Sequence, residues 1–208
     1  MRTKEKILEK ALILFAEKGY ANVSVEEIAA EVGIKAPSLY KHYKSKQDIF
    51  NAVIDKLKKS DTHEELVNSL NANDEFDNTG AFIGNVEKLI TAIGFESFVH
   101  LSGPTQLKQF RKLMSVEQFN TTEPAELFVK QYYDDMISRY SDLFSKLSSS
   151  DVLKNEDPEL MALQFYAPLF MLMTMSDAIP ERKNEFSCLY ENYIDLFIKI
   201  YSKENHIS

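Results

Sequence analysis

The side chains best suited to chemistry lie in one short polar segment near the N-terminus. Basic, hydroxyl and imidazole groups follow one another there, and among them Leu39 is expected to face a core. The groups in question are Lys35, Ser38, Tyr40, Lys41, His42 and Tyr43. Lysine, serine and histidine can bind phosphate oxygens or guanine acceptors, and a tyrosine ring can touch a thymine methyl group. This pattern favours a DNA-contacting surface over the alternative, an ordinary solvated helix face.

Two short helices and a tight turn are expected to position this segment. Ser24 and Glu27 have the spacing of a capping box, and the helix that they open ends at Gly33. Pro37 suits the first turn of a second helix over residues 36–43, because no amide donor is needed there. The order of short helix, turn and short helix predicts a helix-turn-helix, whose second helix can enter the major groove of DNA.

Helical spacing of apolar residues continues through most of the chain, and no alternating strand pattern interrupts it. Gly and Pro number only six each, which indicates long helices with few connections. Further helices are expected over residues 46–57, 79–100, 105–119, 122–147 and 158–178, followed by a last helix after Pro180. We therefore predict an all-α fold, with a helix-turn-helix domain over residues 1–45 joined to a larger helical domain over residues 46–208.

The charge is distributed unevenly between the two parts of the chain. Residues 1–59 hold 12 Lys and Arg against 8 Asp and Glu, a balance of +4. The remaining residues hold 12 against 24, and the two balances of +4 and −12 sum to the net charge of −8. A basic end on an acidic body fits a protein in which the N-terminal part meets phosphates.

The N-terminal segment resembles the signature of the TetR family of transcriptional regulators. The matching positions are Ile28-Ala29, Val32-Gly33, Leu39-Tyr40, His42-Tyr43 and Lys44-x-Lys46, within a resemblance that covers about residues 5–57. The resemblance implies that one row of side chains faces DNA and that Lys46 holds a phosphate from the start of the next helix. The implied contacts are Ser24, Lys35, Ala36, Pro37, Ser38, Tyr40, Lys41, His42, Tyr43 and Lys46. Ala36 stands where some relatives carry a polar base-reading side chain, so apolar base contact is expected there.

The resemblance also implies a homodimer that binds a palindromic operator as a repressor and is released by a small-molecule effector bound within the larger domain. A sizeable, largely apolar effector is expected, because no dense charge cluster is present. The candidate ligand-binding residues are Phe95, Phe98, His100, Arg111, Met114, Tyr132, Met136 and Phe165. Pro168 is expected to free a carbonyl within its helix. The apolar side chains among the candidates are equally typical of an ordinary core, and the polar ones of a surface.

Surplus apolar surface on the last two helices supports the dimer. Apolar residues spread around the whole circumference of the helix over residues 158–178, so it needs burial on more than one face. The candidate interface residues are Tyr166, Phe170, Met173, Tyr190, Tyr193 and Phe197. A monomer with a deep core is the alternative.

Other classes of function find little support in the sequence. Four isolated histidines and the single Cys188 provide no metal-ligand spacing, and no catalytic set can be assembled, so we expect no cofactor and no enzyme. The lone cysteine and the lack of a signal peptide indicate the cytoplasm. The apolar run over residues 160–176 is short for a membrane span and contains Gln164 and Pro168. A helical adaptor that binds a partner protein through its N-terminal helices is the main alternative.

Overall fold

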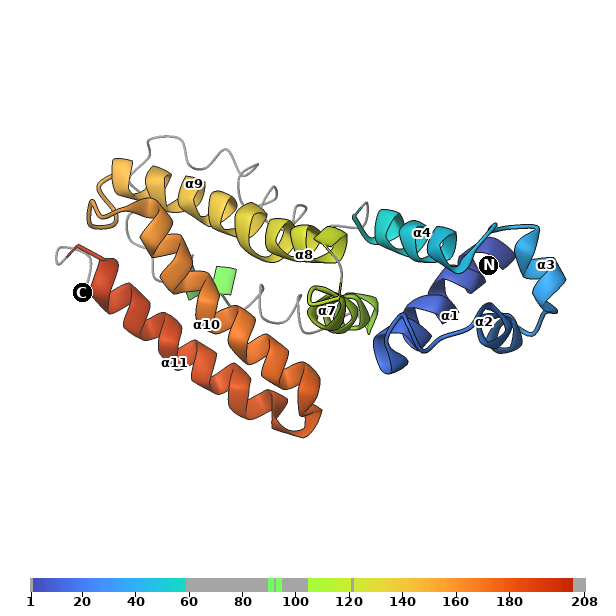
Figure 1. The fold of residues 1–208 in the computed structure, drawn as a ribbon. Coiled ribbons are helices and arrows are strands. Elements are labelled where there is room, and N and C mark those ends of the chain that lie inside the picture. The colour runs from blue at the N-terminus through green and yellow to red at the C-terminus, as the bar shows by residue number, and fades with distance from the viewer. Residues whose placement is uncertain (1, 59–89, 92, 95–104, 121, 204–208) are drawn as a thin grey trace. The chain divides into compact units, whose positions relative to one another are not determined.

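The computed structural model describes residues 2–58, 90–91, 93–94, 105–120 and 122–203 (Figure 1). The chain forms two compact units, of which the first comprises residues 1–61 and 104–128 and the second comprises residues 62–103 and 129–208. Within the described ranges the regular elements are helices, with one isolated bridge between Leu153 and Ser202. The predicted all-α fold is confirmed, whereas the functional boundary after residue 45 stays a prediction.

The first unit is built around α1. Its elements are α1 (Thr3–Lys18), α2 (Val25–Val32), α3 (Ala36–Tyr40), α4 (Lys46–Lys58), α7 (Thr105–Glu117) and α8 (Thr122–Val129). Helices α2, α4 and α7 pack against α1. The ring centroids of Phe15 on α1 and Phe50 on α4 lie 5.8 Å apart, and the ring of Tyr20 lies 5.4 and 4.8 Å from them. These rings form an apolar seam between α1 and α4, and α7 also packs against α1.

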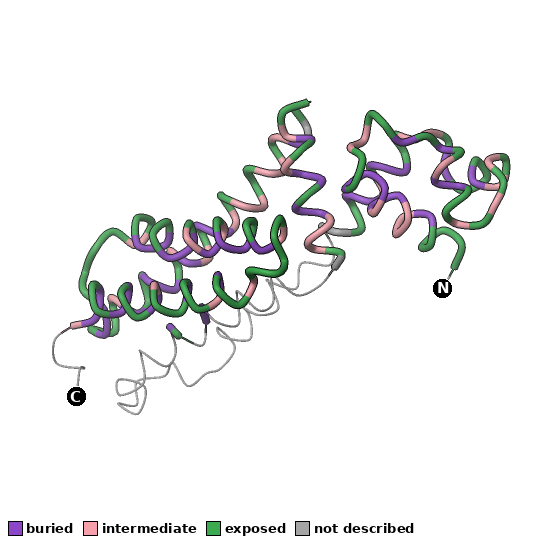
Figure 2. Tube along the Cα trace, turned by 90° about the horizontal axis from the view of Figure 1, so that it is seen from below, coloured by how far each residue is buried: buried purple, intermediate pink, exposed green. Residues whose placement is uncertain are grey.

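The second unit packs three long helices around an aromatic core. Its elements are η3 (Lys130–Asp134, a π-helical turn), α9 (Asp135–Ser149), α10 (Pro158–Ala178), η4 (Pro180–Arg182) and α11 (Lys183–Tyr201). Phe165 of α10 lies 5.4 Å from Phe144 of α9 and 5.3 Å from Phe197 of α11, measured between ring centroids. Buried residues line the facing sides of these helices along most of their length (Figure 2). One core therefore holds α9, α10 and α11 together.

The helix boundaries follow most of the local signals in the sequence. The Asp157 carboxylate accepts the amides of Glu159 and Leu160, at 2.9 and 3.3 Å, and so caps the N-terminus of α10. The helix expected over residues 122–147 is found as α8, η3 and α9 in unbroken succession. The helix expected over residues 79–100 lies mostly outside the described residues. Among the described helices, none is long and apolar enough to cross a membrane.

Pro168 lies inside α10 and leaves the carbonyl of Gln164 without its usual helical partner, because proline has no amide proton. The hydroxyl of Tyr193 on α11 donates to that carbonyl. The hydroxyl of Tyr201, at the end of α11, donates to the side-chain oxygen of Gln164 at 2.7 Å. The predicted free carbonyl therefore becomes an attachment point between α10 and α11.

Tyr193→Phe removes the hydroxyl that serves the proline-freed carbonyl. We expect the free energy of unfolding to fall by about 1 kcal/mol, the typical net value of one hydrogen bond of this kind. Urea denaturation followed by circular dichroism measures the change. Tyr133→Phe is the matched control, since that side chain is exposed on η3. Equal midpoints for the two variants would contradict the assigned role of Tyr193.

Candidate nucleic-acid interface

Helix α2 is capped at both ends by the residues from which its bounds were predicted. The Ser24 hydroxyl accepts the amide of Glu27 at 3.1 Å. The Glu27 carboxylate pairs with the Lys18 ammonium, and this partner together with the Ser24 amide lowers the pKa of Glu27. At the other end, Gly33 adopts the left-handed conformation with φ 79°. The amides of Gly33 and Ile34 donate to the carbonyls of Ala30 and Ala29. These paired bonds form a Schellman motif that fixes the turn.

Helix α3 is shorter than predicted, because the helix ends at Tyr40 and the chain then turns through Lys41 and His42. The amides of His42 and Tyr43 both donate to the carbonyl of Leu39, at 2.8 and 3.2 Å, which tightens this turn. Leu39 itself is fully buried and anchors α3 to the first unit.

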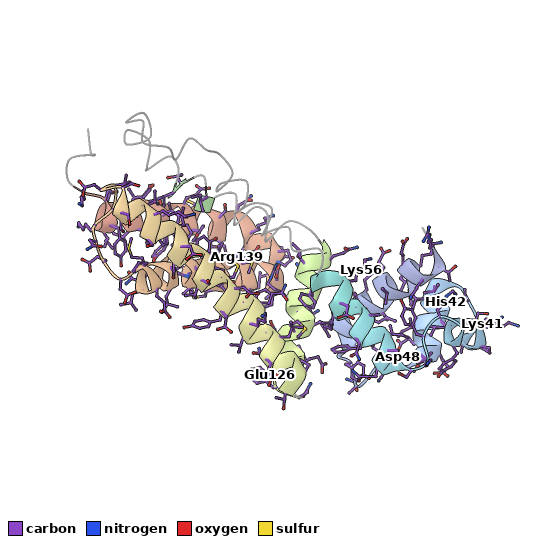
Figure 3. The ribbon with its side chains drawn as sticks, turned by 90° about the horizontal axis from the view of Figure 1, so that it is seen from above. Lys41, His42, Asp48, Lys56, Glu126 and Arg139 are labelled. Atoms are coloured by element: carbon purple, nitrogen blue, oxygen red, sulfur yellow. The ribbon has the colours of Figure 1, made fainter. Side chains whose placement is uncertain are left out.

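The predicted DNA-contacting residues divide by their exposure. Those with exposed side chains are Ser24, Lys35, Pro37, Tyr40, Lys41 and His42, whereas Ala36, Ser38 and Lys46 are half-buried. Lys41 and His42 lie at the outer end of the turn after α3, and Lys41 projects away from the helices (Figure 3). The structure therefore places the exposed residues around one short helix and its two flanking turns.

Tyr43 differs from the others, because its side chain is only 6% exposed. Its hydroxyl is buried and has no hydrogen-bond partner among the described residues, and this burial raises the pKa of the hydroxyl. The Lys4 ammonium lies 5.4 Å from the centroid of the Tyr43 ring. The expectation that the Tyr43 hydroxyl reaches a phosphate is corrected on this point: the ring packs in the core at the end of α3. In the sequence, nothing distinguishes Tyr43 from the nearby Tyr40, which is exposed.

Tyr43→Phe removes a buried hydroxyl that makes no hydrogen bond within the described part of the chain. An unsatisfied buried polar group costs about 1–3 kcal/mol, so we expect the variant to be as stable as the wild type or more stable by up to that amount. Operator affinity is expected to stay within about twofold, since the side chain contacts no phosphate. Thermal denaturation and a duplex-binding titration measure both effects. A clear loss of affinity at unchanged stability would indicate that Tyr43 contacts DNA after all.

Lys46 stands at the first position of α4 and reaches back toward the loop between α1 and α2. Its ammonium donates to the carbonyls of Tyr20 and Ala21, at 2.9 and 3.4 Å, and lies 4.3 Å from the centroid of the Tyr20 ring. These two bonds use two of the three donors of an ammonium group. The Ser45 hydroxyl accepts the amide of Asp48 at 3.0 Å and so caps the N-terminus of α4.

The predicted ligand-binding residues fall in different parts of the chain. Arg111 and Met114 are buried on α7 in the first unit. In the second unit, Met136 and Phe165 belong to the core, and the ring of Tyr132 lies 5.6 Å from that of Phe170. Phe95, Phe98 and His100 lie outside the described residues. An open groove along α9 and the start of α10 is lined by acidic and hydroxyl groups, including Asp134, Ser138, Ser141, Asp142, Asp157 and Glu159. This groove is not the apolar pocket that the sequence predicts.

Four of the six predicted interface residues are buried inside the protomer. Tyr166, Met173, Tyr190 and Phe197 belong to the core of the second unit, and Phe170 and Tyr193 are half-buried. The expectation that the four core residues meet a partner is therefore corrected. Exposed apolar residues follow one stripe along each of α10 and α11 instead: Leu160, Leu163, Met171, Met175, Leu189, Leu196 and Ile200. The sequence does not distinguish this stripe on α10 from the core face, since residues 160–176 contain no charged residue on any side of the helix.

Within the ranges that the structure describes, no three His, Cys, Asp or Glu side chains are grouped so that they could hold a metal ion. A helix-turn-helix that presents exposed basic and hydroxyl side chains, in an all-helical chain, instead defines the class of DNA-binding transcriptional regulators.

Comparison with known proteins shows which regulators of that class this chain is similar to. Residues 7–53 match the model of the bacterial regulatory proteins of the tetR family. Over 207 residues the chain is 24% identical to IcaR of Staphylococcus epidermidis, the negative transcriptional regulator of the biofilm operon icaADBC, covering 94% of this chain and 99% of that protein. IcaR of Staphylococcus aureus strain Newman is 47% identical over 47 residues, which cover 23% of this chain and 25% of that protein.

The fold agrees with the sequence matches. A TetR-family transcriptional regulator from Mesorhizobium loti MAFF303099 superposes with a TM-score of 0.71 at 19% identity, covering 97% of this chain and 98% of that chain. Residues 7–53 therefore form a segment of the kind found in bacterial regulatory proteins of the tetR family, and the chain is similar over nearly its whole length to a negative transcriptional regulator.

Proposed function

We propose that this protein is a sequence-specific repressor that binds a palindromic operator as a homodimer. The observation that carries the proposal is the exposed row at Tyr40, Lys41 and His42 on a helix-turn-helix fixed at both ends. Lys35 and Pro37 at the start of α3 extend that row, with Ser24 and Lys46 at neighbouring helix N-termini. Side chains in these places suit base edges and the flanking phosphates. Repression is supported by similarity to IcaR, a negative regulator.

The dimer is supported by the uncharged apolar stripes on α10 and α11. Leu160, Met171, Leu189 and Leu196 are each more than half exposed in the protomer, which is unusual for such a run of large apolar side chains. The two helices lie side by side (Figure 1). Two copies related by a two-fold axis would cover both stripes at once and would match the symmetry of a palindromic operator.

Release from DNA is proposed to follow a population shift. A small, largely apolar effector binds the conformer in which the two recognition helices are misplaced for two half-sites about one helical turn apart. An effector that prefers this conformer about 100-fold contributes roughly 2.7 kcal/mol against operator binding. The protein is proposed to act in the cytoplasm, where its operator lies.

Selection of bound duplexes from a random pool tests the proposal with the purified full chain. A palindromic consensus is the expected result, and it reports operator sequence, dimer symmetry and half-site spacing together. Affinity for the consensus duplex should fall steeply with salt, because Lys and Arg contacts release counterions. A helical adaptor for a partner protein would give no consensus and no salt-sensitive duplex binding. That result would overturn the proposed function.

A further inference from the structure

Tyr20 is the point at which three elements of the first unit are joined. Its amide donates to the Glu117 carboxylate on α7 at 2.9 Å, and its carbonyl accepts the Lys46 ammonium of α4 at the same distance. Its hydroxyl donates to the side-chain oxygen of Gln47 at 2.8 Å, and its ring packs against Phe15 of α1. The peptide groups on both sides of Tyr20 are therefore held, one by α7 and the other by α4.

Glu117 is an unusual residue to find in this position. Its side chain is only 5% exposed, and a carboxylate is rarely buried to this extent unless hydrogen bonds compensate the lost hydration. Two donors compensate it here: the amide of Tyr20 and, at 3.2 Å, the side-chain amide of Asn120. The burial of the Tyr20 hydroxyl and the nearby negative charge of Glu117 both raise the pKa of that hydroxyl. The carboxylate is thus built into the unit rather than placed on its surface.

Gly19 stands directly before this contact, and its backbone conformation rather than a lack of space favours glycine there. A Cβ atom at Gly19 would lie 3.8 Å from the Glu117 carboxylate, and the residue adopts a φ of +79°, which side chains rarely tolerate. The loop that begins at Gly19 leads directly to the Ser24 cap of α2. The Glu117 bond therefore fixes the loop at the entrance to the helix-turn-helix, and the same loop supplies both carbonyl acceptors of Lys46.

We propose that Glu117 is a positioning residue for DNA binding, which holds the backbone of Tyr20 so that Lys46 meets a phosphate from the start of α4. The inference rests on the proposed function, in which Lys46 contacts DNA. Glu117 is buried and touches no phosphate itself. On charge alone, its removal should strengthen binding to a polyanion. The positioning role requires weaker binding instead. The sign of the change in affinity therefore distinguishes the positioning role from a purely electrostatic effect.

The test measures affinity of the full chain for a labelled duplex that carries the selected consensus. Glu117→Leu keeps much of the volume and removes the acceptor, and it is expected to weaken binding about tenfold. Glu117→Gln retains an oxygen acceptor for the Tyr20 amide and is expected to stay within about twofold of the wild type. Glu126→Leu removes one negative charge from an exposed site on α8 of the same unit and should not weaken binding (Figure 3).

A double-mutant cycle connects Glu117 to Lys46. In the background of Lys46→Met, Glu117→Leu should cause less than about a twofold further loss, because the group that it positions is already absent. Full multiplication of the two losses, or binding by Glu117→Leu as tight as that of the wild type, would overturn the inference. If Glu117→Leu does not fold, Glu117→Asp carries the same test, since it keeps the charge and withdraws the carboxylate. A wild type that binds no duplex would overturn the proposed function as well.

Discussion

Replacing Leu196 with Arg is expected to convert the protein from a dimer to a monomer and to weaken operator binding by about 100-fold or more. Leu196 is 52% exposed in the protomer, so an arginine there meets no steric conflict within one chain. In a two-fold dimer the substitution places two unpaired cations in an apolar interface, where each loses its hydration.

The loss of affinity follows from the loss of linkage between two half-sites. In a dimer, binding of one recognition helix brings the second to its half-site at a high effective concentration, which contributes about 10²–10⁴ in affinity. A monomer contacts one half-site and forfeits this factor. The Met171→Arg variant on α10, whose side chain is 53% exposed, is expected to give the same result from the neighbouring stripe.

Two measurements check this prediction. Light scattering coupled to gel filtration should give the mass of one chain, 23.9 kDa, for the variants and about twice that mass for the wild type. Titration of the consensus duplex gives the affinity. Asn184→Arg introduces the same charge at an exposed position of α11 away from the stripe and should leave both unchanged. Dimeric Leu196→Arg protein with normal affinity would contradict the proposed interface.

The helix-turn-helix was predictable because short-range signals determine it. The Ser24 cap and the left-handed Gly33 each act within a few residues of themselves, and both are found as the sequence predicts; the Ser45 cap of α4 is a signal of the same local kind. The cap at Asp157 and the carbonyl freed by Pro168 are equally local. Such a local signal can be recognised in the sequence without knowing which helices pack against one another.

The direction in which a side chain faces was harder to predict where neighbouring elements decide it. Tyr43 and Tyr40 are chemically alike, but the first is buried and the second is 47% exposed. On α10, apolar residues surround the helix, so periodicity alone could not separate the core face from the exposed stripe. The sequence also gave no signal for the bond between Glu117 and the Tyr20 amide, which joins residues 97 positions apart.

Phe165→Ala is expected to lower the free energy of unfolding of the second unit by about 3–5 kcal/mol. Sequence reasoning placed Phe165 among the ligand-binding residues, whereas in the structure its ring is 1% exposed. Its ring centroid lies 4.9 Å from that of Tyr140, and Phe144 and Phe197 flank it at similar distances. Removal of the ring leaves a cavity bounded by three helices, which cannot close without moving their backbones.

The size of the loss distinguishes a core ring from a ring that lines a binding cavity. If Phe165 already faced an empty pocket, its truncation would forfeit contacts on one side only, and the cost would be smaller. Urea denaturation followed by circular dichroism, at one fixed protein concentration, measures it. Phe165→Leu, which keeps most of the volume, should cost less than about 1.5 kcal/mol. A loss below about 1 kcal/mol for Phe165→Ala would indicate that the ring lines a binding cavity, because removal of a ring packed on all sides lowers the stability by more than that.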